Sequence, residues 1–270
     1  MSSQDKNLGA LKRRLFIKRV KMVLTVVSVA GFFVFLGWLT RETPLFKFEG
    51  IKIVGTKQIS NQELTDYFNK KKNAELSAKL LTADNIIPWL LIKKDDSVLR
   101  DFPRIYDYDI KKSFFRKDVE VDVTEREEKN IWCSEDAEAG RTCYWMDDKG
   151  TIFGNAPESE GELIRVIIDK SGKKVEMGKA PFSEAELVNF SKMSDLVYKW
   201  NLAISSIYIE SADLNDIFFS LEGGKEIYFN LDTDPTFGDS VIKNLKNSGE
   251  WNSLDYLDLR IQGKGFYKLK

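Results

Sequence analysis

The pattern of apolar and polar positions begins with one long uncharged stretch. No residue from Met22 to Thr40 carries a charge; the run reads MVLTVVSVAGFFVFLGWLT. As a helix it would span about 28 Å, close to the hydrocarbon thickness of a bilayer. Residues 1–21 hold seven basic side chains against one acidic side chain, and the positive-inside rule keeps such a segment in the cytoplasm. The pattern therefore predicts a cytoplasmic basic tail (1–21), a transmembrane anchor (22–40) and an exterior remainder.

A removed signal peptide is the alternative to an anchor. Signal peptides have a shorter apolar core, followed by a small-x-small cleavage site. Here the core ends in Gly37-Trp38-Leu39-Thr40-Arg41 without an Ala-x-Ala sequence. Because Trp38 also suits the membrane interface, we expect an uncleaved, single-pass anchor.

After the span, residues 45–127 show the pattern strand–helix–helix–strand–strand. Ser60-Asn61-Gln62-Glu63 is the sequence of a capping box, and Leu64, Tyr67 and Phe68 would share one helix face. The other expected elements are strands at 46–53, 105–111 and 118–125 and a second helix over about 93–100 that stops before Pro103.

Residues 128–270 predict a mostly antiparallel sheet with packed helices. Ser183-Glu184-Ala185-Glu186 is a second capping-box sequence, and Gly223-Gly224 would turn one strand into the next. The last expected elements are a short helix through Phe237, Val241 and Leu245 and strands at 256–261 and 266–269. The expected fold class is thus α+β, with one N-terminal transmembrane helix.

The amino-acid composition limits the kinds of functional site that the chain is expected to contain. The chain contains no histidine, so the commonest general base and the commonest metal ligand are missing. No phosphate-binding glycine motif occurs, and Asp147-Asp148 and the pair Asp232 and Asp234 lie beside Gly or Pro, as in turns. We expect no catalytic site, metal, cofactor or nucleic-acid partner, although composition alone leaves a carboxylate-only enzyme such as a cell-wall glycosidase open.

The two cysteines are candidates for a disulfide. Cys133 and Cys143 flank SEDAEAGRT, between the strand-like segments IWC and CYWM. A hairpin would bring them together, and an oxidising exterior would allow the bond. Two unpaired thiols, or a register that places them on opposite faces, are the alternatives.

Several segments resemble, in order and spacing, the FtsQ/DivIB family of bitopic cell-division proteins. FKFEGIKIVGTKQISNQEL is similar to the opening of the family's POTRA domain. In VLRDFPRIYDYDIKKSFFRKDVEVDVTEREEKNIW, recognisable family positions are occupied by Pro103, Glu125, Arg126 and Trp132. WMDDKGTIF resembles a turn of the family's β-domain, and LDYLDLRIQGKGFYKLK, with Asp258-Leu259-Arg260, resembles its ending.

The resemblance implies a POTRA domain (45–127), a β-domain (128–270) and a non-enzymatic scaffold at the division septum of the bacterial cytoplasmic membrane. Its expected partners are FtsB/FtsL-like bitopic proteins and the septal peptidoglycan-synthesis machinery. In this family a partner adds a strand near the C-terminal strand of the β-domain, where backbone hydrogen bonds supply affinity. The first strand and helix of the POTRA domain are a second expected docking surface.

The C-terminal segment carries the expected contacts. The residues expected to touch the partner are Arg260, Ile261, Gly265, Phe266 and Tyr267. The alternative is that Leu259, Ile261 and Phe266 face the core. The sequence ends at Lys270, directly after a strand, so we expect no long segment over this edge. Lys264, Lys268 and Lys270 would either guard it against aggregation or pair with an acidic partner.

Two other classes of protein remain open from sequence. One is a different POTRA-bearing export or assembly protein, which would normally precede an outer-membrane barrel for which this chain has no room. The other is a membrane-anchored cell-wall enzyme, which the missing histidine and the lack of a nucleophile motif disfavour.

Overall fold

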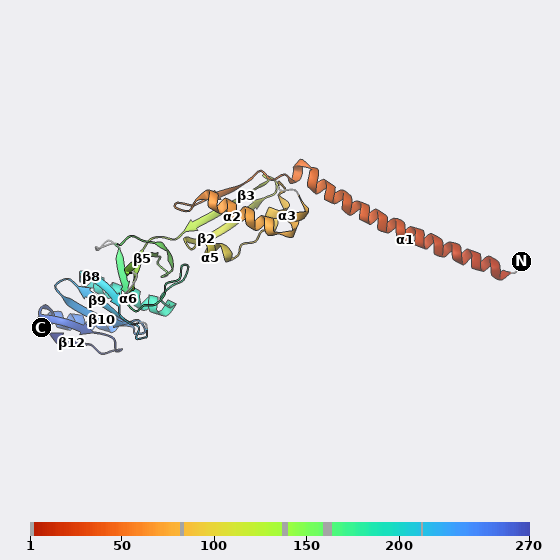
Figure 1. The fold of residues 1–270 in the computed structure, drawn as a ribbon. Coiled ribbons are helices and arrows are strands. Elements are labelled where there is room, and N and C mark those ends of the chain that lie inside the picture. The colour runs from red at the N-terminus through yellow and green to blue at the C-terminus, as the bar shows by residue number, and fades with distance from the viewer. Residues whose placement is uncertain (1–2, 82–83, 137–139, 159–163, 212) are drawn as a thin grey trace. The chain divides into compact units, whose positions relative to one another are not determined.

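The computed structural model describes residues 3–81, 84–136, 140–158, 164–211 and 213–270 (Figure 1). The fold is α+β, with a long apolar N-terminal helix and a large mixed β-sheet with helices. The chain divides into two compact units. The first contains residues 1–94 and 108–123, and the second contains residues 95–107 and 124–270.

Helix α1 (Ser3–Glu42) contains the expected span. Its segment Phe16–Arg41 is long and apolar enough to cross a membrane, and the most apolar stretch of that segment has a mean hydropathy of 2.3. None of its most apolar stretch is buried by the rest of the chain. This helix fits a single membrane anchor or a signal sequence. A short 3-10 helix, η1 (Pro44–Phe46), follows it.

The first unit is built on a three-stranded sheet in the order β1-β3-β2. Strand β1 (Gly50–Val54) runs parallel to β3 (Asp118–Glu125). Strand β2 (Ile105–Ser113) precedes β3 along the chain and lies on its other side in the sheet. Val119, Val121 and Val123 are buried, as their alternation predicts. Gly55 ends β1 at φ +87°, where an added Cβ would lie 2.1 Å from the carbonyl oxygen of Val123, so only glycine fits this close backbone approach.

The helices of this region differ in part from expectation. Helix α2 (Asn61–Ala74) begins where predicted and buries Leu64 and Phe68, but its N-cap, Ser60, makes no side-chain capping bond. Two short helices, α3 (Leu76–Leu80) and α4 (Ile87–Leu91), were not expected. The helix expected at about 93–100 is confirmed only in its second half, where α5 (Ser97–Asp101) forms, because residues 92–95 are not helical. The physical reason is local: the Asp95 carboxylate accepts a hydrogen bond from the Ser97 amide (2.9 Å) and starts a new helix there.

The second unit is built on a nine-stranded sheet in the order β12-β11-β10-β9-β8-β7-β4-β5-β6. Its strands are β4 (Asn130–Asp136), β5 (Gly140–Met146), β6 (Ile152–Asn155), β7 (Arg165–Asp169), β8 (Ile204–Ile209), β9 (Asp216–Leu221), β10 (Lys225–Asn230), β11 (Leu254–Asp258) and β12 (Phe266–Leu269). The sheet is mixed, because β4·β7, β7·β8 and β10·β11 are parallel pairs. Parallel neighbours need crossovers, and helices α6 and α7 supply two of them.

One face of this sheet carries the main core. Helix α6 (Glu184–Lys199) and helix α7 (Gly238–Ser248) bury Phe190 and Ile242 against strand residues such as Phe219 and Phe229. The capping box predicted at the start of α6 is confirmed. Ser183 Oγ accepts from the Glu186 amide (3.3 Å), and Glu186 Oε2 accepts from the Ser183 amide (2.6 Å).

Candidate functional site

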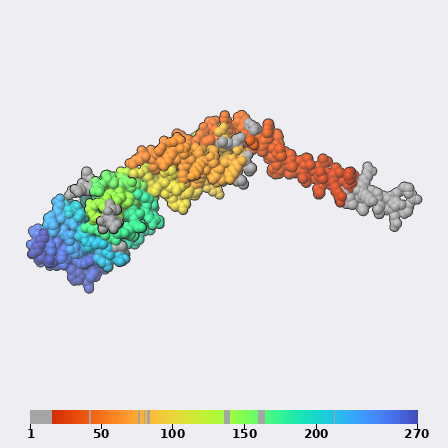
Figure 2. All heavy atoms as spheres, viewed as in Figure 1, coloured from red at the N-terminus to blue at the C-terminus, as the bar shows by residue number. Residues whose placement is uncertain are grey.

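The C-terminal strand β12 is an edge of the large sheet. It pairs antiparallel with β11 on one side, and no strand in the described part of the chain pairs with its other side. All of its side chains are exposed, including Phe266 at 53%. Figure 2 shows the C-terminal residues, in blue, on the outer surface of the second unit. Two of the residues expected to contact a partner, Phe266 and Tyr267, therefore lie on a sheet edge with unused backbone groups.

Successive residues of β12 direct their backbone amide and carbonyl groups alternately toward β11 and away from it. The Lys270 amide donates to the Ser253 carbonyl (2.8 Å), so its backbone faces β11. In an antiparallel pair the facing groups alternate with every residue. The amide and carbonyl groups of Tyr267 and Leu269 therefore point away from β11 and are those that an added strand would use.

The two faces of β12 carry different side chains. Phe266 and Lys268 lie opposite Asp258 and Tyr256, while Tyr267 lies opposite the buried Leu257. Alternate side chains of the edge thus reach different faces of the sheet. Lys268 pairs with Asp255 (2.9 Å), and Lys270 donates to the Gly223 carbonyl (3.3 Å), so these two edge lysines have partners within the chain.

The loop before β12 holds the other expected residues. Leu259 is fully buried, whereas Ile261 is 54% exposed, so the alternative that Ile261 and Phe266 face the core is wrong. Gly265 lies against helix α7, where an added Cβ would be 2.9 Å from Val241 Cγ1. Glycine at this position lets the chain pass close to α7 before β12 begins.

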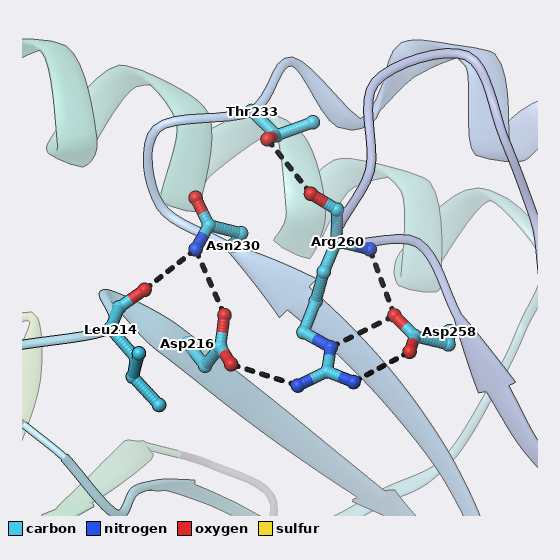
Figure 3. Close-up of polar contacts among 6 residues, drawn as sticks. All are labelled: Leu214, Asp216, Asn230, Thr233, Asp258 and Arg260. Atoms are coloured by element: carbon cyan, nitrogen blue, oxygen red, sulfur yellow. Dashed lines mark hydrogen bonds and ion pairs between the residues drawn. The ribbon is translucent and has the colours of Figure 1, made fainter.

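Arg260 is held by acidic side chains of its own unit (Figure 3). Its guanidinium makes two hydrogen bonds to the carboxylate of Asp258, at 2.9 and 2.6 Å, and one to Asp216 at 2.9 Å. Asn230 Nδ2 also donates to Asp216 (2.8 Å), and Thr233 Oγ1 donates to the Arg260 carbonyl (3.1 Å). Such a fork between two carboxylates fixes the loop that leads to β12.

The same contacts shift the pKa values of Arg260 and Asp258 in opposite directions. The hydrogen bond that the Arg260 side chain donates to Asp258 leads the effects that raise the pKa of the Arg260 guanidinium. Partial burial acts to raise the pKa of the Asp258 carboxyl, but hydrogen bonds from the Arg260 side chain and backbone lower it below its usual value. The predicted contact of Arg260 with a partner stays a prediction, and the geometry gives this side chain an internal role as well.

A row of aromatic rings crosses the sheet face that carries Arg260. We call Tyr208, Phe218, Tyr228 and Tyr256 the aromatic row; their consecutive ring centroids are 5.0, 5.1 and 5.0 Å apart. Glu226 accepts hydrogen bonds from the hydroxyls of Tyr208 and Tyr228, both at 3.0 Å. Burial and then the bond to Glu226 raise the pKa of Tyr228 to about 12.

Sequence reasoning missed the aromatic row. Its members belong to different strands, and the sequence does not state the strand order that brings them side by side. The available signal was the half-buried aromatic residue that alternates with buried residues within a strand, as Phe218 does between Ile217 and Phe219. The row ends at Tyr256, whose neighbour on the edge strand is Lys268.

The two cysteines lie at the other side of the sheet. Cys133 and Cys143 are directly opposite each other in the β4–β5 hairpin and form a disulfide. Both are buried in a small cluster with Ile131. Residues 137–139, within the SEDAEAGRT loop, lie outside the described residues.

The metal-ligating side chains and one open groove of the described residues bear on the alternative of an enzyme. No group of three or more metal-ligating side chains gathers among them. An open groove of about 890 Å³ lies beside α6, β7 and β8, and its described lining includes Arg141, Arg165 and one carboxylate, Asp195. A glycosidase uses two carboxylates that flank the scissile bond, and this lining does not supply such a pair.

No protein-family model matches the chain, and no curated protein matches it.

Proposed function

We propose that this chain is a membrane-anchored, non-enzymatic scaffold of the bacterial cell-division machinery, organised as in the FtsQ/DivIB family. Helix α1 is the uncleaved anchor, and its basic tail is cytoplasmic. Residues 45–127 form a POTRA domain, and residues 128–270 form a β-domain. The order of a strand, helices and two further strands in the first of these supports the assignment.

The observation that carries the proposal is the open edge at β12. FtsB/FtsL-like partners would add a strand there and pair with the outward backbone groups of Tyr267 and Leu269. Phe266 and Lys268 on one face, with Tyr267 and Leu269 on the other, would select the partner's side chains. The Arg260 fork supports this function because it holds the preceding loop in place before a partner binds.

Localisation tests the cellular part of the proposal. A fluorescent protein fused to the cytoplasmic N-terminus should give a sharp band at midcell in dividing cells. A uniform envelope signal in dividing cells would argue against a divisome scaffold and favour export, assembly or cell-wall chemistry.

The strand-addition part needs a variant that keeps the fold. Deleting residues 256–270 would also remove Leu257 and Leu259 from the core, because both are fully buried. The substitution Tyr267→Pro is a more specific test of strand addition than this deletion. It removes an outward-facing amide and leaves the inward-facing amides of Phe266 and Lys268 intact.

Tyr267→Ala is the matched control, because it removes the same side chain and keeps the amide. We expect full-length Tyr267→Pro to bind co-expressed FtsB/FtsL-like partners about tenfold more weakly than Tyr267→Ala does. Circular dichroism should show that both variants remain folded. Equal binding by the two folded variants would mean that no strand is added at this edge.

A further inference from the structure

The turn between β2 and β3 exposes an aromatic side chain among basic ones. Residues 111–117 read KKSFFRK, with four cationic side chains around Phe114 and Phe115. Phe115 is 95% exposed, the largest exposed fraction among the large apolar side chains that the structure describes. We call residues 113–117 the β2–β3 tip. A fully exposed phenylalanine is costly in water, so its surroundings matter.

Strand pairing places this tip at the end of the sheet where the chain enters from α1. Strands β1 and β3 are parallel, and Gly50 at the start of β1 lies beside Asp118 at the start of β3. Just before these positions, the Glu49 amide donates to the Lys117 carbonyl (2.8 Å). Because parallel strands start at the same end, the tip and the entrance to β1 are neighbours.

Side-chain contacts bring the tip close to the end of the apolar helix. The rings of Phe114 and Phe46 pack edge to face, with centroids 5.7 Å apart. Phe46 is five residues after Arg41, where the apolar segment ends, so the chain between them can reach at most about 18 Å. The buried Asn85 also donates to the carbonyl of Thr40 in the last turns of α1 (2.6 Å).

The charges of the tip suit an anionic surface. Arg116 lies 3.3 Å from Asp118, and 66% of its side chain is still exposed. The Lys117 ammonium is 3.9 Å from Glu49, and Lys111 pairs with Asp122 and Glu120 on β3. Lys112 is turned inward and donates to the carbonyls of Leu90 and Ile92. Arg116 is thus the best-placed cation for a lipid phosphate.

We propose that the β2–β3 tip inserts Phe115 into the interfacial layer of the same bilayer that α1 crosses. Aromatic rings and cationic side chains favour this layer, where the ring leaves water and the charge meets lipid headgroups. Leu45, 63% exposed and next to Phe46, adds apolar surface beside the tip. The contact would give the first unit a second attachment to the membrane. It uses α1 as an inserted span and does not depend on strand addition at β12.

The test uses the full chain in bilayers made from phosphatidylethanolamine and phosphatidylglycerol. A nitroxide attached at Phe115→Cys reports collision with oxygen, which concentrates in lipid, and with a water-soluble nickel complex. The native cysteines do not compete, because they form a disulfide. Tyr198→Cys is the control, since Tyr198 is 83% exposed on α6 of the second unit.

We expect the label at 115 to collide mainly with oxygen and the label at 198 mainly with the nickel complex. Arg116→Gln should lower the inserted fraction up to about fivefold in this anionic bilayer, and have little effect in phosphatidylcholine alone. An unlabelled check is trypsin cleavage after Arg116 and Lys117, which bilayers should slow in the native chain but not in Phe115→Ser.

A label at 115 that meets the nickel complex as freely as the label at 198 overturns the proposal. Protection that arises only in native envelope membranes, and not in lipid alone, would also overturn it and identify the tip as a protein contact. Neither result would affect strand addition at β12, whose test is partner binding by the Tyr267 variants.

Discussion

The guanidinium of Arg126 lies 2.5 Å from the carboxylate of Asp147, and the two side chains are only 12% and 2% exposed. Arg126 Nε also donates to the Pro103 carbonyl (2.9 Å). Asp147 in turn accepts from the amides of Lys149 and Thr151, at 3.0 and 2.7 Å, and so shapes the turn before β6. Three segments that are distant in sequence are thereby joined at one buried ion pair.

Removing one partner of this pair should be strongly destabilising. Arg126→Ala leaves the Asp147 carboxylate buried without its cation, which typically costs about 3–5 kcal/mol. The midpoint of denaturant unfolding of the full chain in detergent should fall accordingly. Arg141→Ala is the control, because Arg141 pairs with Glu135 at the surface, where such pairs contribute about 0–1 kcal/mol. Similar losses in the two variants would contradict a buried, coupled pair.

Acid should weaken the fold partly through Asp258. Its folded-state pKa is lowered, so the folded state binds a proton less readily than the unfolded chain does. The resulting stabilisation is complete above the ordinary aspartate pKa of about 4, and it is lost as the pH falls through the lower folded value. Unfolding midpoints at about pH 6 and about pH 3 should therefore differ less in Asp258→Asn than in the native chain.

Asp234→Asn is a second variant that should change the acid-induced shift of the unfolding midpoint in the same direction. Its pKa is lowered to about 2, chiefly by the hydrogen bond from Lys192. Asp234→Asn should also reduce the acid-induced shift. An undiminished shift in both variants would mean that other carboxylates control acid unfolding.

The disulfide should stabilise the β4–β5 hairpin. Cys133 and Cys143 are ten residues apart, and closing a loop of this size is worth about 3 kcal/mol in the chain-entropy model. A reducing agent should lower the melting temperature of the native chain. The double variant Cys133→Ser/Cys143→Ser should melt lower and show no response to reductant. A native chain that melts equally with and without reductant would contradict this contribution.

Gly265 should tolerate even a methyl group poorly. An added Cβ would lie 2.9 and 3.0 Å from the two methyl carbons of Val241, so Gly265→Ala should destabilise by about 1–3 kcal/mol through overpacking. Val241→Ala makes room for that methyl group. The double variant Gly265→Ala/Val241→Ala should therefore lose less stability than the two single losses added together. If the stability losses of the two single variants simply add, the loop at Gly265 and Val241 of α7 are not in tight contact.

Most local sequence patterns predicted the structure correctly, whereas contacts between distant segments were not predicted. The capping box at Ser183 and the Val119–Val123 alternation were correct because their patterns lie within a few residues of chain. The helix expected at 93–100 begins only at Ser97, because the turn at Asp95 precedes it. The parallel pairs β7·β8 and β10·β11 were missed, since a strand's own sequence does not name its neighbour.

The sequence by itself determined the apolar helix, the α+β class and the positions of most strands, because periodicity and charge are local properties. Only the tertiary structure decided that β12 is an edge, that Arg260 lies between Asp216 and Asp258, and that Phe114 meets Phe46. These contacts join residues far apart along the chain, and their energies depend on strand order and burial. That is why the candidate edge could be expected from the C-terminal motif, while the groups that support it could not.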